Sequence, residues 1–197
     1  AGDSVTDAFT MTVTDSDSSE TDTMTVTVTV TGADDDVNAG ADQTGAVTED
    51  ASTATATGTV AATDADADSA FTYAIGTAAG TYGTLSMSGA AWTYTLDNSD
   101  ADTNTLDAGD SVTDAFTITV SETDSSETDT MTVTITITGA DDDVSAGADQ
   151  TGAVTEDASA TTATGTIAGS DADDASSLAY SGDATGTYCS IAVVSSS

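Results

Sequence analysis

TDTMTVTVTVT, residues 21–31, decides the fold of this chain because apolar and polar side chains alternate along it without a break. Met24, Val26, Val28 and Val30 fall on one face, and the threonines fall on the other. Strict period-two alternation of β-branched residues is typical of a half-buried antiparallel strand. DAFTMTVT at residues 7–14 shows the same alternation, and polar DSDSSE at residues 15–20 lies between the two stretches. The sequence therefore predicts a β-hairpin here.

Nearly all of the first 53 residues return later in the chain at one fixed offset. AGDSVTDAFT begins at Ala1 and again at Ala108, and ADQTGAVTEDAS begins at Ala41 and again at Ala148, so the offset is 107 residues in both cases. A period of this size is a whole domain, which indicates a tandem array of small domains. We expect the C-terminal half of one repeat at 1–37, a complete repeat at 38–144 and the N-terminal half of the next at 145–197. This register is typical of a window on a longer polymer.

The rest of the complete repeat continues the strand pattern. Short alternating runs centred on Val60, Phe71, Leu85 and Trp92 are separated by Gly, Asp and Ser turns, and no stretch has helical spacing. About seven short strands in about 107 residues predict an all-β fold, a tandem array of Greek-key immunoglobulin-like β-sandwich domains. The expected core consists of Val47, Val60, Phe71, Tyr73, Ile75, Leu85, Met87, Trp92, Tyr94, Leu96, Phe116, Ile118, Val120, Met131, Val133, Ile135 and Ile137.

The composition is extreme in charge. The chain has no Lys, Arg, His or Pro but 35 Asp and Glu residues, for a formal charge of −35. Three origins fit: a sequence inferred indirectly with long side chains recorded as short ones, a protein adapted to high salt, and a designed array. The charge excludes nucleic acid and anionic membranes as partners, because no basic residue can neutralise a phosphate. The negative charge favours metal cations as partners. It also indicates a fold whose stability depends on counter-ions.

Several motifs together resemble a known family. TGAVTEDAS, TDADAD, GTYGTL, WTYTLDNSDA, LDAGDSVTDAFTITV and MTVTITITGADDDV run in order through the complete repeat. This order resembles the VCBS repeat of giant bacterial adhesins, which is akin to cadherin-like and other immunoglobulin-like modules. The resemblance implies a β-sandwich stalk outside the cell, commonly loaded with calcium. The family's proline-containing linker is replaced by Asp34–Val37 and Asp141–Val144, which puts a rigid linker in doubt.

Acidic loops are the candidate calcium ligands. Asp64, Asp66 and Asp68 occupy alternate positions of one loop, a spacing that lets carboxylates converge on a hard cation. The same residues are also ordinary turn formers, and both readings stay open. The family resemblance implies further ions where modules meet. By that resemblance, Asp34, Asp35 and Asp36 would meet Glu49, Asp50, Asp64, Asp66 and Asp68. In the same way, Asp141, Asp142 and Asp143 would meet Glu156, Asp157, Asp171, Asp173 and Asp174.

Catalysis has little support in the sequence. A serine nucleophile lacks His or Lys as a base, and Cys189, the only cysteine, lacks a histidine to activate it. One cysteine without histidine also cannot build a transition-metal cluster. We therefore expect no enzyme but an extracellular structural stalk, stiffened by calcium at acidic loops and links, with neighbouring repeats as its partners. The alternative is a filament subunit whose half-domains complement each other head to tail. That joined unit would lack the counterpart of residues 92–107.

Overall fold

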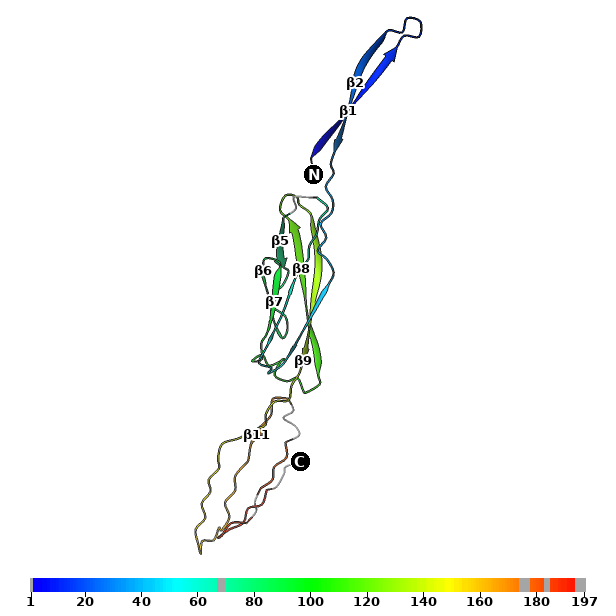
Figure 1. The fold of residues 1–197 in the computed structure, drawn as a ribbon. Helices are drawn as coiled ribbons and strands as arrows, with labels where there is room; N and C mark the ends of the chain where they lie inside the picture. The colour runs from blue at the N-terminus through cyan, green and yellow to red at the C-terminus, as the bar shows by residue number, and fades with distance from the viewer. Residues whose placement is uncertain (1, 67–69, 174–177, 183–184, 194–197) are drawn as a thin grey trace.

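The computed structural model describes residues 2–66, 70–173, 178–182 and 185–193, and the described part contains strands and turns but no helix (Figure 1). It forms an elongated chain with a compact sandwich in the middle, a free hairpin on one side and an extended segment on the other. The strands of the sandwich are β3 (Gln43–Thr48), β4 (Thr55–Thr59), β5 (Phe71–Ile75), β6 (Gly83–Ser88), β7 (Ala91–Leu96), β8 (Ser111–Glu122) and β9 (Thr128–Thr138).

The seven strands form two sheets, which confirms the predicted sandwich. One sheet has four strands in the order β3-β9-β8-β5, and the other has three in the order β4-β7-β6. β3 runs parallel to β9, with Gln43 opposite Val133 and Thr48 opposite Thr138, whereas every other pair in the sandwich is antiparallel. β3 and β9 are parallel because both strands begin at one end of the long axis of the sandwich and finish at the other end. We call these two ends the poles of the domain.

The core lies between the sheets and consists of the side chains that the alternation predicted. All seventeen expected core residues are buried or pack half-buried against the cluster. Trp92 and Tyr94 from the three-stranded sheet are 1% and 0% exposed, and Phe116 from the four-stranded sheet is 2% exposed. The rings of Tyr94 and Phe116 pack across the sheets with centroids 5.8 Å apart. Val37, Ala39 and Leu106 complete the core.

The free hairpin consists of β1 (Ser4–Thr14) and β2 (Thr21–Thr31), which pair antiparallel from Ser4–Thr31 to Thr14–Thr21. It confirms the hairpin that the sequence predicted. β8 and β9 pair from Ser111–Thr138 to Ser121–Thr128, which is the same register shifted by 107 residues. The difference lies in burial, because every residue of β1 and β2 is exposed.

The segment after residue 144 is mostly extended. Its described residues contain only β10 (Ser145–Ala146) paired with β11 (Gly169–Ser170), and an isolated bridge between Thr185 and Ser190. ADQTGAVTEDAS forms β3 in the complete repeat because β9 pairs with it. Its copy at residues 148–159, all of them described, forms no strand.

Candidate metal centres at the repeat junctions

Glu49 is the buried acid at the pole where the complete repeat ends. It follows β3 directly, and its amide donates to the carbonyl of Thr138 at 2.9 Å, which extends the parallel pairing by one residue. Its side chain is 2% exposed, and Oε2 accepts a hydrogen bond from the amide of Ala140 at 3.3 Å. Asp50 then turns the chain with a φ of 52°, a left-handed conformation that Asp tolerates better than most residues. The strand thus delivers Glu49 to the linker after β9.

The linker and the following repeat bring further carboxylates to Glu49. The amide of Asp142 donates to Oδ2 of Asp173 at 2.6 Å, and the amide of Asp173 donates to Oδ1 of Asp171 at 3.3 Å. Glu49 Oε1, Asp142 Oδ2 and Asp173 Oδ1 are buried without a hydrogen-bond partner among the described residues. We call Glu49, Asp50, Asp142, Asp171 and Asp173 the exit cluster.

The carboxylates of the exit cluster repel one another. Burial raises the pKa of Glu49, and the charges of Asp142, Asp50 and Asp173 raise it further. Burial also raises the pKa of Asp142, aided by hydrogen bonding to Asp50 and by the charge of Asp173. Carboxylates that are desolvated together favour protonation or a cation. Their oxygens are the ligand type that calcium prefers.

A corresponding arrangement lies at the pole where the repeat begins. The amide of Asp35 donates to Oδ2 of Asp66 at 3.0 Å, and the amide of Asp66 donates to Oδ1 of Asp64 at 2.7 Å. Asp35 and Asp66 are the repeat counterparts of Asp142 and Asp173, so both linkers hold the following acidic loop in the same way. The amide of Asp35 is also the main cause that lowers the pKa of Asp66.

Two glutamates at the tip of the β8–β9 hairpin join this pole: Glu122 ends β8, and Glu127 precedes β9. One carboxylate oxygen each from Asp34, Glu122 and Glu127 lie within 4.8 Å of one another. Burial raises the pKa of Glu127, and the nearby charges of Asp34, Asp36 and Glu122 act in the same direction. We call Asp34, Asp35, Asp64, Asp66, Glu122 and Glu127 the entry cluster.

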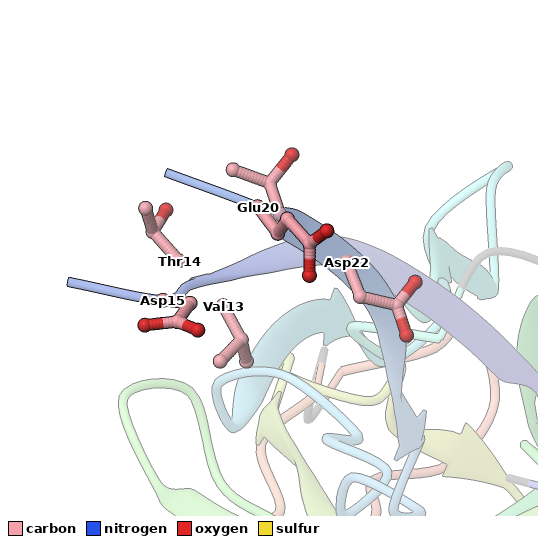
Figure 2. Close-up of a pocket in the computed structure, with 6 residues that line it drawn as sticks. Val13, Thr14, Asp15, Glu20 and Asp22 are labelled. Atoms are coloured by element: carbon pink, nitrogen blue, oxygen red, sulfur yellow. The ribbon is translucent and has the colours of Figure 1, made fainter. Parts of the chain in front are cut away.

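The free hairpin carries the counterparts of these loop acids. Figure 2 shows Asp15, Glu20 and Asp22 around an open hollow at its tip, lined also by Val13, Thr14 and Thr21. Asp15 and Glu20 stand where the complete repeat has Glu122 and Glu127. The hydroxyl of Ser18 and the amide of Asp17 donate to Asp15, and these bonds lower its pKa. Every repeat in this chain that contains the hairpin thus presents an acidic tip.

The structure brings together part of the predicted ligand sets. Asp34–Asp36 lie with Asp64 and Asp66, and Asp141–Asp143 form the linker whose central residue contacts Asp173. Asp68 and Asp174, which were expected in these sets, lie outside the described residues.

The expected pairing of Glu49 and Asp50 with Asp34–Asp36 is wrong. β3 lies between the two ends of the domain, and its six residues span about 20 Å at ~3.3 Å per residue. Glu49 therefore reaches the linker after β9. Glu156 and Asp157 are the counterparts of Glu49 and Asp50, and Asp157 repeats the left-handed turn with a φ of 58°. Their pairing with Asp141–Asp143 stays a prediction.

Sequence reasoning missed Glu122 and Glu127. Alternation in the sequence outlines the β8–β9 hairpin that carries them, but the position of its tip depends on how β3 and β9 pair. If β3 runs parallel to β9, the loop between β8 and β9 must lie at the pole where Asp34–Asp36 enter the domain. The acids of that loop then face the linker.

A β-sandwich with its first and last strands parallel, and with carboxylates gathered at both poles, defines an immunoglobulin-like module. The family model of the bacterial cadherin-like domain matches residues 34–139, more than half of the chain. The chain belongs to this family, an adhesion-type domain family. The match supports the cadherin-like part of the resemblance, while the VCBS repeat itself stays a prediction.

Two solved structures are similar to the chain. The protocadherin GammaB4 extracellular domain is 16% identical with a TM-score of 0.38, over 78% of this chain and 27% of that one. Human CDH23 EC21-23 is 20% identical with a TM-score of 0.42, over 81% of this chain and 54% of that one. The chain thus spans about a quarter and about half of these two proteins. No curated protein matches it. Among the described residues, no helix is long and apolar enough to cross a membrane.

Proposed function

We propose that the chain is a stalk module of a long extracellular adhesin or surface fibre, stiffened by calcium at the entry and exit clusters. Its partners are calcium ions and the neighbouring repeats. The observation that carries the proposal is Glu49, a residue only 2% exposed whose Oε1 has no hydrogen-bond partner in the described part of the chain and whose carboxylate feels the charges of Asp142, Asp50 and Asp173. A divalent cation offsets this repulsion and joins the end of one repeat to the loop of the next.

The ligand residues come from both sides of each junction. Glu49 and Asp50 belong to the repeat that ends, Asp141–Asp143 to the linker, and Asp171 with Asp173 to the repeat that follows. An ion bound by all three parts restricts the angle between the repeats, whereas an empty junction lets like charges push them apart. Asp36, Asp68, Asp141, Asp143, Asp174, Glu156 and Asp157 remain candidate ligands on the evidence of the sequence.

Thermal unfolding tests the proposal. Calcium at about 100-fold above its dissociation constant contributes ~2.7 kcal/mol per site, which raises the Tm of a domain this size by roughly 10–20 °C. We expect this rise with millimolar calcium, its loss on chelation, and no replacement by sodium at equal ionic strength. Glu49→Gln should reduce the rise, while Asp102→Asn, an exposed change away from both clusters, should leave it intact. A Tm that does not change when calcium is added or removed would contradict the proposal.

A second candidate is a filament subunit whose half-domains join head to tail. The observation that favours it is the exposed apolar side chains in both flanking segments, among them Phe9 and Val28 before the complete repeat and Val154 and Ile191 after it. Sedimentation across a range of concentrations separates the two candidates, because a filament grows with concentration while a stalk module stays monomeric.

A further inference from the structure

The point where the linker leaves β9 is fixed to the sandwich by three successive hydrogen bonds. The carbonyl of Thr138 accepts from the amide of Glu49 at 2.9 Å, and the amide of Ala140 donates to Oε2 of Glu49 at 3.3 Å. Between these contacts, the amide of Gly139 donates to the carbonyl of Asp110 at 3.0 Å. The start of the linker is therefore held both by the residue after β3 and by the loop before β8.

The loop between β7 and β8, residues 97–110, comes too close to Gly139 to leave room for a side chain. A Cβ on Gly139 would lie 2.5 Å from the carbonyl oxygens of both Leu106 and Asp107, and 2.8 Å from the carbonyl carbon of Leu106. All three atoms belong to the backbone, and real Cβ atoms do not approach other heavy atoms this closely. The φ of Gly139 is not positive, so space and not backbone conformation requires the glycine here.

The β7–β8 loop cannot easily move aside, because it is anchored in the core. Leu106 is 7% exposed and belongs to the core cluster, and Thr103 is 0% exposed. The amide of Leu106 donates to the carbonyl of Thr103 at 3.1 Å, and the amide of Asp110 donates to that of Asp107 at 2.9 Å. Moving the loop would expose Leu106 to water, so a side chain at position 139 would displace the linker instead.

The geometry of the exit cluster depends on the direction that the linker takes at Gly139. Ala140 is the next residue, and its hydrogen bond occupies Oε2 of Glu49, while Oε1 has no hydrogen-bond partner in the described part of the chain. Asp142 lies only three residues beyond Gly139, and its amide donates to Oδ2 of Asp173 at 2.6 Å. A change of direction at Gly139 would therefore move Asp142 relative to Glu49.

We propose that Gly139 is a positioning residue for the exit cluster. Because it has no side chain, the linker can pass close to the β7–β8 loop, and this path brings Asp142 to Glu49. Gly139 acts through the linker and supplies no ligand atom of its own to the ion. The inference rests on the calcium junction proposed above and adds the residue that sets the direction of the linker.

Calcium titration of the full 197-residue protein, followed by amide NMR, tests the proposal at each cluster separately. The amides of Ala140 and Asp142 report the exit cluster, and those of Asp35 and Asp66 report the entry cluster in the same sample. We expect Gly139→Ala to weaken calcium binding about tenfold at the exit amides, because contacts that orient metal ligands commonly contribute this much. Binding at the entry amides should stay within about twofold. Unchanged binding at the exit amides would overturn the proposal.

Gly58→Ala is the matched control, because it also introduces a methyl group where there is no space for one. Its Cβ would come within 2.5–2.6 Å of three indole atoms of Trp92, inside the core and away from the linker. We expect this variant to lower the Tm in chelator and to leave calcium binding at the exit amides within about twofold. If both variants weakened calcium binding equally, the effect of Gly139→Ala would be one of stability alone and the proposal would be overturned.

Hydrogen exchange in chelator tests the position of the linker without calcium. The amide of Ala140 should exchange slowly in the unsubstituted protein, because it is bonded to Glu49. In Gly139→Ala it should exchange roughly tenfold faster, since the displaced linker no longer reaches this acceptor. Fast exchange of the Ala140 amide in the unsubstituted protein would overturn the proposal, whether or not the variant folds.

The two measurements keep this inference apart from the proposed function. A protein that does not respond to calcium, but shows the expected difference in Ala140 exchange, would reject the calcium junction and support Gly139 as the residue that directs the linker. A calcium response that Gly139→Ala retains in full at the exit amides would reject only the positioning role.

Discussion

The hydroxyl of Tyr94 donates a 2.8 Å hydrogen bond to Oδ2 of Asp114, and this contact joins the two sheets inside the core. Tyr94 belongs to β7 and Asp114 to β8, and both side chains are almost fully buried. The amides of Thr81 and Tyr82 donate to the same carboxylate, so one acid fixes a strand and a loop together. A buried charge is tolerated when its hydrogen-bonding capacity is satisfied in this way.

Asp114→Ala should lower the free energy of unfolding by about 2–3 kcal/mol, because it leaves buried donors without an acceptor. Tyr94→Phe should cost about 1 kcal/mol, since it removes one donor and keeps the ring. Denaturant unfolding measures both values. Asp110→Asn, an exposed change four residues earlier in the chain, is the control and should have no measurable effect.

Alkaline pH should weaken the domain through the same residue. Burial raises the pKa of Tyr94 above its ordinary value of 10.0, and the hydrogen bond and charge of Asp114 raise it further. A group whose pKa is raised by folding contributes stability that is complete below the unfolded pKa and is lost as the pH rises. Unfolding followed from pH 8 to 11 should therefore show a decline above about 10 that is smaller in Tyr94→Phe. An equal decline in both proteins would contradict this assignment.

Without calcium, the chain should become more stable as the pH falls from 7 towards about 5. Burial and neighbouring carboxylates raise the pKa of Glu49, Glu127 and Asp142, so each contributes stability at low pH that is lost as the pH rises through its folded value. The pKa of Asp129 is lowered by the amides of Ala39 and Thr130, and its contribution is lost only as the pH falls below 3.8. The Tm in chelator should thus pass through a maximum at mildly acidic pH. Calcium should abolish the rise, and Glu49→Gln should reduce it.

Gly58→Ala should destabilise the domain by about 1–3 kcal/mol through overpacking. Gly58 lies opposite Trp92 in the β4–β7 pair, and a Cβ at this position would come within 2.5–2.6 Å of three indole atoms. Gly76→Ala is the matched control, because its Cβ would meet only the carbonyl of Thr117 at 3.7 Å. Tryptophan fluorescence during unfolding reports both variants. Equal stability of the two would show that the indole shifts at no cost.

The strands and the core could be predicted from the sequence, because period-two alternation marks both the element and its buried face. Met131, Val133, Ile135 and Ile137 lie at alternate positions, and all of them are buried. The pairing of β3 with β9 could not be predicted in this way, since alternation does not specify a neighbour. That pairing places Glu49 and Asp50 at the exit pole and Glu122 and Glu127 at the entry pole, so two members of each acidic cluster depended on topology.

The Asp114 network was also beyond the sequence. A single aspartate within an alternating strand is read as a polar position, and its donors at Thr81, Tyr82 and Tyr94 are distant in the chain. The role of this acid is seen only in the close packing of the loop against β8. A Cβ added at Gly80 would collide with the carboxylate of Asp114.

The parallel pair of β3 and β9 determines how the domain would carry mechanical force. The chain enters the sandwich at the pole where β3 begins and leaves it at the pole where β9 ends. Tension applied between the two ends of the domain therefore pulls these neighbouring strands in opposite directions along their length. Their hydrogen bonds are loaded in shear and must break together, whereas an antiparallel hairpin pulled at its open end would unzip one pair at a time.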